Sequence, residues 1–147
     1  MLDDTDRKQF QQVFPQFVSR MTPRGLQRLL DACVRADVRP GYNIFRDRMP
    51  TDSVHFILEG EADIFVEQDD RTIPLGKVKA GALLGEISVL SRQLVASSTV
   101  QATTRVRSLR LQHQSLELLL TDEEAGPPLL ELFSETLASR LQPLAAA

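Results

Sequence analysis

One stretch of the chain brings glycine, a carboxylate and hydroxyls together in a pattern that suits binding of a sugar–phosphate. Gly81 and Gly85 precede a short apolar run, and a glycine before a helical turn lets backbone N–H groups approach an anion closely. Glu86 stands beside those amides, where its carboxylate can accept a hydrogen bond from a ligand hydroxyl while the amides hold a phosphate. The hydroxyls of Ser97 and Ser98 would supply further donors.

The same residues also allow a structural interpretation. Glu86 could cap the short helical turn, and Ser97 and Ser98 could be strand residues that face a solvated pocket. Both interpretations stay open on the residues alone.

Other site chemistries find little support. The sequence holds no nucleophile elbow, Walker loop or GxGxxG motif. His55 and His113 are isolated, whereas a metal site needs three or more converging ligands, so a cupin-type metalloenzyme is not expected. The single cysteine, Cys33, lies among leucines at helical spacing and is expected to be a buried, inert thiol. The sequence therefore predicts no enzyme, no catalytic residue, no metal and no cofactor.

Bulk composition limits the partners further. The 147 residues carry a formal net charge of −3, which gives no electrostatic footprint for nucleic acid. No apolar run is long enough to span a bilayer, and the acidic, polar start is unlike a secretory signal. We expect a cytoplasmic protein that does not bind DNA through this chain or enter a membrane.

Three zones position these residues. Up to about Ala36 the apolar spacing predicts helices, with a break at Pro15 and a cap at Thr22 before Pro23. From Gln114 onward the spacing is helical again, and Gly126-Pro127-Pro128 separates two helices.

The middle zone predicts strands, because short runs rich in Val, Ile, Phe and Thr alternate with turn residues. A hairpin turn at Glu67 to Arg71 contains two aspartates. Leu83 to Leu90 predicts a short helical turn between strands, because its apolar residues have helical spacing. The predicted strands are Val54–Leu58, Ala62–Glu67, Ile73–Val78, Ser98–Ala102 and Arg105–Leu111.

These features resemble the cyclic nucleotide-binding domain family, which includes catabolite activator protein and the regulatory subunits of protein kinase A. The resemblance covers Pro40 to about Leu120. Phe56-Ile-Leu-Glu-Gly60 matches the barrel pattern of the family, and Leu84 to Leu90 matches its phosphate-binding cassette.

The resemblance implies roles for individual residues. The position of Glu86 holds the ribose 2′-hydroxyl, the backbone around Gly85, Ile87 and Ser88 helps to hold the cyclic phosphate, and Ser97 can add a hydroxyl contact. The predicted ligand-binding set is Leu84, Gly85, Glu86, Ile87, Ser88, Ala96, Ser97 and Ser98.

One departure from the family pattern bears on affinity. The family places an arginine after the cassette to pair with the cyclic phosphate, and here that position is Ala96, with Arg92 as the nearest cation in the loop. Such a charge-assisted hydrogen bond is worth roughly 1.5–3 kcal/mol, so its loss predicts an affinity about ten- to a hundredfold lower. Arg48 and Thr51 also stand where family glycines form a turn.

The sequence thus predicts a mainly β fold with flanking helices, a cyclic-nucleotide-binding double-stranded β-helix, or jelly-roll-like barrel. It is expected to be one domain over residues 1–147, with N-terminal helices to 37, a barrel over 38–112 that contains the cassette at 81–100, and C-terminal helices over 113–147. The expected function is regulatory, with weak, altered or no binding of cAMP or cGMP.

The alternative is a protein-interaction module with a vestigial pocket. The last helix could cover the barrel mouth or pair with the same helix in a second copy. The resemblance allows both arrangements, and a homodimer is slightly favoured.

Overall fold

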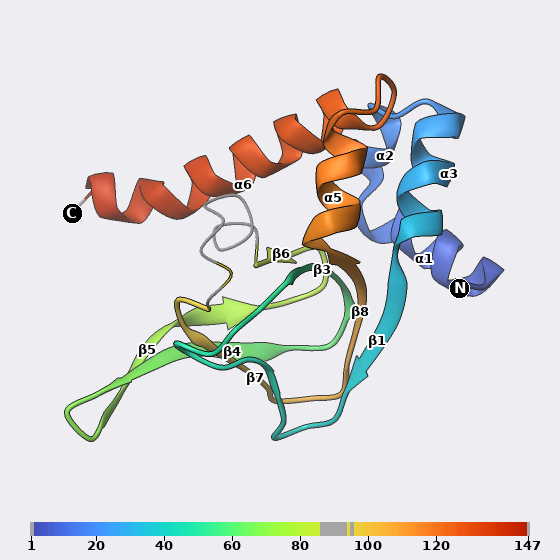
Figure 1. Ribbon diagram of the computed structural model, residues 1–147. Helices are drawn as coiled ribbons and strands as arrows, with labels where there is room; N and C mark the ends of the chain where they lie inside the picture. The colour runs from blue at the N-terminus through green and yellow to red at the C-terminus, as the bar shows by residue number, and fades with distance from the viewer. Residues whose placement is uncertain (1, 86–93, 95, 147) are drawn as a thin grey trace. The chain divides into compact units, whose positions relative to one another are not determined.

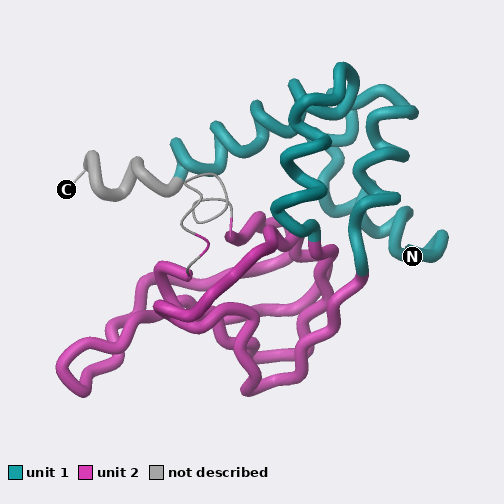
Figure 2. Tube along the Cα trace, viewed as in Figure 1, with its two compact units in different colours: residues 1–34, 111–147 teal, residues 35–110 magenta. Residues whose placement is uncertain are grey.

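The computed structural model describes residues 2–85, 94 and 96–146, which form two compact units (Figures 1 and 2). The helical unit joins Met1–Val34 to Leu111–Ala147, and the strand unit is Arg35–Arg110. That residues 1–147 form one domain stays a prediction. The helices are α1 (Asp4–Val13), α2 (Pro15–Ser19), α3 (Pro23–Ala32), α5 (His113–Leu120) and α6 (Gly126–Ala146).

Local signals set the ends of the N-terminal helices. The carboxylate of Asp3 accepts the N–H of Asp6 at 2.8 Å and thereby caps α1. Pro15 is the first residue of α2, which confirms the predicted break after α1. The hydroxyl of Thr22 accepts the N–H of Gly25 at 3.0 Å, which confirms the predicted cap of α3. In α6, Pro127 and Pro128 lie in the first turn, where their missing N–H groups cost nothing.

Aromatic rings fill part of the core of the helical unit. The rings of Phe10 and Phe14 are stacked with centroids 5.1 Å apart, and Phe17 meets Phe10 edge to face at 6.1 Å. Cys33 is buried, and this burial raises the pKa of its thiol to about 12. The thiol is therefore protonated at neutral pH, as expected for an inert structural cysteine.

The prediction of helix up to about Ala36 is wrong. The third helix, α3, ends at Ala32, and Val34–Val38 form strand β1, which lies beside β8 in a sheet. Helical spacing placed Val34 on the apolar stripe, yet its side chain is 43% exposed. A β-branched residue suits a strand, and the pairing with a segment far along the chain decides its conformation.

The strands form two four-stranded sheets rather than one closed barrel. One sheet has the order β1-β8-β3-β6, and the other has the order β2-β7-β4-β5 (Figure 1). This arrangement confirms the mainly β, jelly-roll-like class with flanking helices. Besides β1, the strands are β2 (Asn43–Phe45), β3 (Ser53–Glu59), β4 (Ala62–Gln68), β5 (Arg71–Val78), β6 (Leu83–Leu84), β7 (Thr99–Ala102) and β8 (Val106–Gln112).

The five predicted strands correspond to β3, β4, β5, β7 and β8. The predicted hairpin turn is also present, because Gln68 pairs with Arg71 and two residues join them. Asp69 and Asp70 have φ angles of 52° and 62°, the left-handed conformation that a two-residue hairpin turn requires.

Strand β3 forms the centre of the strand unit. Six of its seven residues, from Ser53 to Leu58, are buried. Because side chains on both faces of the strand are buried, buried and exposed residues do not alternate along it. Apolar side chains from the two sheets, including Ile57, Val100 and Val106, pack in one core cluster. This rigid strand supports the residues of the candidate site.

Candidate functional site

The start of the predicted cassette lies directly on strand β3. Leu84 is buried in β6 and pairs with His55, and Gly85 follows with a φ angle of +88°. A Cβ atom at Gly85 would come within 2.6 Å of the carbonyl oxygen of Ser53 and 3.0 Å of the ring of Phe45. Only glycine permits both this backbone angle and this close approach.

The prediction of a helical turn over Leu83 to Leu90 is wrong at its start, where Leu83 and Leu84 form a strand. Their backbone pairs with β3, which overrides the helical spacing of the leucines. Glu86, Ile87 and Ser88 lie outside the described residues, and so does Arg92.

The other end of the cassette is held by main-chain hydrogen bonds to the loop between β2 and β3. The N–H of Ala96 donates to the carbonyl of Met49 at 3.0 Å, and the N–H of Arg48 donates to the carbonyl of Ala96 at 2.9 Å. The N–H of Thr51 donates to the carbonyl of Leu94 at 2.8 Å. These bonds fix where a side chain at position 96 begins.

The side chains at this end differ in exposure. Ala96 is buried, with 7% of its surface exposed, whereas Ser97 is exposed and Ser98 is half-buried. The methyl group of Ala96 carries no charge, so this buried position supplies no cation to a phosphate. The structure places Leu84 and Gly85 at one end of the cassette, and Ala96, Ser97 and Ser98 at the other.

The loop that shares these hydrogen bonds contains a strained residue. Arg48 has a φ angle of 65°, a left-handed conformation that costs a residue with a side chain roughly 1–2 kcal/mol. The sequence places Arg48 where the family pattern has a glycine, so the backbone keeps the glycine conformation although the residue has changed.

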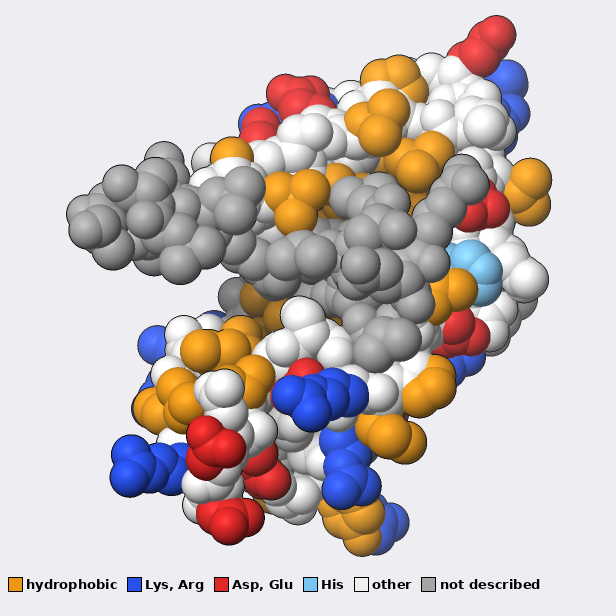
Figure 3. Space-filling model, turned by 60° about the vertical axis from the view of Figure 1, so that its left-hand side comes forward, with side chains coloured by type: hydrophobic (Ala, Val, Ile, Leu, Met, Phe, Trp, Pro, Cys, Tyr) orange, Lys and Arg blue, Asp and Glu red, His pale blue; other side chains and the backbone are white. Residues whose placement is uncertain are grey.

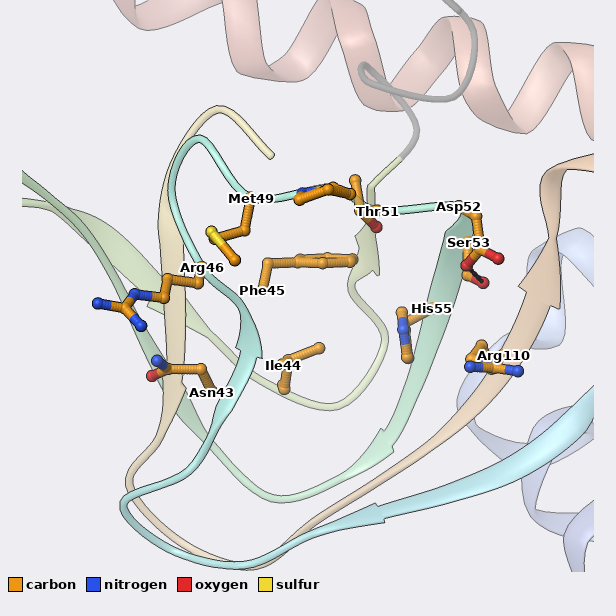
Figure 4. A pocket seen from close by; sticks show the side chains of 11 residues that line it. Asn43, Ile44, Phe45, Arg46, Met49, Thr51, Asp52, Ser53, His55 and Arg110 are labelled. Carbon is orange, nitrogen blue, oxygen red and sulfur yellow. Dashed lines mark hydrogen bonds between the residues drawn. The ribbon is translucent and has the colours of Figure 1, made fainter. Parts of the chain in front are cut away.

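A cavity of about 390 Å³ lies between β2, this loop, β3 and β8 (Figure 4). Ser53 and Phe45, which support Gly85, also line it. Figure 4 shows His55 and Arg110 at one end, on neighbouring strands, and Ile44, Phe45 and Met49 in the middle.

His55 is the most perturbed group in this cavity. Its side chain is buried, and its Nδ1 atom shares a hydrogen bond of 2.9 Å with the hydroxyl of Ser108. Burial, aided by the positive charge of Arg110, lowers the pKa of His55 from 6.5 to about 4. His55 is therefore neutral at physiological pH. The ring of Phe45 meets it edge to face, with centroids 5.2 Å apart.

Arg107 and Arg110 both lie in β8, but their side chains have different surroundings. Arg107 forms ion pairs with Asp37 and Glu59, while Arg110 is half-buried and lines the cavity. Successive strand residues point to opposite faces, so Ser108 and Arg110 share a face and Arg107 does not. On the face drawn in Figure 3, basic and acidic side chains lie among one another, and no single sign of charge dominates.

Sequence reasoning missed four residues that shape this region: Phe45, Ser53, His55 and Arg110. The two-residue period of β8 could have placed Arg110 on the face of Ser108. No sequence signal pairs His55 with Ser108, because their contact depends on the order of strands in the sheet.

Two features of the described part of the chain concern metal binding and membrane spanning. Within residues 2–85, 94 and 96–146, no cluster of His, Cys, Asp or Glu could hold a metal ion. Among the helices that the structure describes, none combines the length and the apolar character needed to cross a bilayer.

The sequence matches one known family and is similar to one named protein. Residues 35–123 match the family described as the cyclic nucleotide-binding domain, which is more than half of the chain. The chain is 32% identical over 107 residues to a Rhodopseudomonas palustris protein named "Putative potassium channel protein". That match covers 71% of the chain but spans only about a quarter of the relative, 25% of its length.

Solved structures share the fold. The sensor domain of the transcriptional regulator DNR from Pseudomonas aeruginosa has a TM-score of 0.75 at 19% identity, covering 95% of this chain and 93% of that one. A regulatory subunit of a cAMP-independent protein kinase A from Trypanosoma brucei, in a triple-mutant form bound to cAMP, has a TM-score of 0.72 at 22% identity. This second match covers 88% of the chain and 46% of the relative.

Proposed function

Because the chain belongs to the cyclic nucleotide-binding domain family, we propose that it is a non-enzymatic regulatory module whose nucleotide pocket has lost the cation for the cyclic phosphate. The observation that carries this proposal is Ala96, a buried methyl group at the position of the family arginine. The main-chain bonds of Ala96 to Arg48 and Met49 hold its backbone in place, so the change is confined to the side chain.

The conformation of Gly85 supports a retained pocket. Gly85 keeps the left-handed conformation and the close approach to Ser53. In this proposal Glu86 accepts the ribose 2′-hydroxyl, the amides near Gly85, Ile87 and Ser88 hold the phosphate, and Ser97 and Ser98 add hydroxyl contacts. The resulting site binds cAMP or cGMP weakly, because a charge-assisted bond worth roughly 1.5–3 kcal/mol is missing.

A ligand of this site would act by a shift in population. If it prefers one arrangement of the cassette, binding favours that arrangement in proportion to the difference in affinity. The curated relative is named as a channel, and the chain spans a quarter of it. We therefore propose that the module works beside an effector part, in the cytoplasm, without binding DNA itself.

The missing charge also favours a second candidate function. A pocket without its phosphate cation could be vestigial, with the protein acting as an interaction module that binds a protein partner or a second copy through α6. The two functions differ in whether an arginine at position 96 restores nucleotide binding.

Calorimetric titration with cAMP and cGMP tests the proposal on the wild type and on Ala96→Arg. The arginine variant should bind about ten- to a hundredfold more tightly than the wild type, which should bind only at millimolar ligand. Ala96→Gln is the matched control, because glutamine adds length without charge, and it should bind like the wild type. The related Trypanosoma brucei triple mutant bound to cAMP includes a threonine-to-arginine substitution, which motivates this design.

Two results would overturn the proposal. Micromolar binding by the wild type with no gain in Ala96→Arg would mean that another cation holds the phosphate. Absence of binding by all three folded proteins would favour the interaction module.

A further inference from the structure

The cavity beside Gly85 has two chemically different parts. At one end lie Arg110, His55 and Ser53, and between β2 and the following loop lie the apolar side chains of Ile44, Phe45 and Met49 (Figure 4). Asn43 and Arg46 lie at the far side of these apolar groups, and Arg46 points away from Arg110. The volume of about 390 Å³ falls in the range of small-molecule sites, about 300–1,000 Å³.

The positive charge of Arg110 forms no ion pair with any residue that the structure describes. Its side chain is half-buried, and its Nε atom is buried without a hydrogen-bond partner among these residues. Two other half-buried arginines form ion pairs: Arg7 with Asp31 at 2.7 Å and Arg107 with Asp37 at 3.6 Å. A buried donor without a partner is costly, and a guanidinium matches the geometry of a carboxylate or phosphate group.

The neighbours of Arg110 leave this charge available. His55 is neutral and its Nδ1 atom is engaged with Ser108, so it adds no competing cation. Asp52 is exposed, and one of its carboxylate oxygens accepts the hydroxyl of Ser53 at 2.8 Å. Among the described residues, no carboxylate forms an ion pair with Arg110 at this end of the cavity.

We propose that this cavity binds a small organic anion, with its carboxylate or phosphate group on Arg110 and its apolar body against Ile44, Phe45 and Met49. The cavity is larger than a bare inorganic ion needs, and its apolar wall would leave such an ion poorly contacted. Among the residues that the structure describes, the lining of this cavity includes none of the predicted nucleotide ligands, and the proposal rests on Arg110 and the apolar wall rather than on the proposed function.

An occupant would touch the supports of both ends of the cassette. Phe45 lies against Gly85, and the carbonyl of Met49 accepts the N–H of Ala96. Binding in the cavity should therefore shift the amide resonances of Gly85 and Ala96 as well as those of the lining residues.

Titrations followed by amide NMR test the proposal on the whole chain with phenyl phosphate and benzoate as probes. Benzyl alcohol is the neutral control, and inorganic phosphate is the control without an apolar body. At least one phenyl anion should bind about tenfold more tightly than either control. The stronger of the two anions identifies the ligand group as phosphate or carboxylate.

Substitution of the cation completes the test. Arg110→Gln should weaken binding of the phenyl anion about tenfold, whereas Arg71→Gln, which removes an exposed arginine of the hairpin, should leave it unchanged. If Arg110→Gln does not fold, the proposal is tested by comparing the affinities of the wild type for the phenyl anions and for benzyl alcohol. Equal binding of benzyl alcohol, equal binding of inorganic phosphate, or no shifts with any probe would overturn the proposal.

Discussion

The two ends of the cassette are anchored to neighbouring parts of the chain by different means. At the start, Gly85 is confined by the backbone of Ser53 and the ring of Phe45. At the other end, main-chain hydrogen bonds join Ala96 to the loop that contains Arg48 and Met49. In the proposed function the first end keeps the residue pattern expected of the family, and the second end departs from it at Ala96, beside Arg48 in the loop.

The difference between the two ends shows what limits the choice of residue at positions 85 and 96. A Cβ at position 85 would meet a backbone atom, so the fold itself requires glycine there. At position 96 the main-chain hydrogen bonds do not depend on the type of side chain, although the methyl group itself is buried. The fold thus requires glycine at position 85, whereas these hydrogen bonds do not require alanine at position 96.

Substitution at the confined end should have the largest effect on stability. Gly85→Ala should lower the free energy of unfolding by about 3 kcal/mol, because a left-handed conformation and a close backbone approach both oppose a side chain. Gly41→Ala is the matched control: its φ angle is also +88°, but nothing lies within 4 Å of the added atom. Urea denaturation should give about 1–2 kcal/mol for this control. Equal losses in both variants would refute the close packing at Gly85.

His55 in β3, which pairs with Leu84 at the start of the cassette, should make the stability of the protein depend on pH. His55 has a pKa of about 4 in the folded protein and an ordinary value of 6.5, so between these values the unfolded chain binds more protons. The contribution of neutral His55 to the free energy of unfolding is fully present above pH 6.5 and is lost as the pH falls towards 4. The loss from His55 should be about 2 kcal/mol from about pH 7.5 to about pH 5.

The measurement compares urea denaturation of the wild type with that of His55→Gln across this range. The variant should lose less stability on acidification than the wild type. Parallel pH profiles for the wild type and His55→Gln would show that His55 is not buried in its neutral form.

Substitution of Arg48, in the loop between β2 and β3, should have a smaller effect on stability and should raise it. Arg48→Gly should stabilise the protein by about 0.5–1 kcal/mol, since glycine relieves the left-handed strain but adds entropy to the unfolded chain. Thr51→Gly is the control, because Thr51 also replaces a family glycine but is not among the described residues with positive φ. It should destabilise the protein, and a gain in both variants would contradict the assigned backbone of this loop.

The sequence predicted the fold well where local signals decide structure. Turn chemistry located the hairpin at Asp69 and Asp70, and capping chemistry located the start of α3 at Thr22. The prediction failed at Val34 and at Leu83, where pairing with a distant strand overrides helical spacing.

The candidate site was predicted unevenly for a related reason. Motif residues such as Gly85 were found because they are consecutive in the chain. Ser53, His55 and Arg110 were not found, because only the strand order brings them to one cavity. The roles of Glu86, Ile87 and Ser88 stay predictions.

The most direct test of the account is a double-mutant cycle on cAMP affinity, with Ala96→Arg and Glu86→Gln alone and combined. The account holds that only the phosphate cation is missing and that the contact to the ribose hydroxyl is retained. Ala96→Arg should therefore tighten cAMP binding about ten- to a hundredfold, and Glu86→Gln should remove most of that affinity in the same background. If Ala96→Arg folds and binds cAMP no better than Ala96→Gln, the account is contradicted.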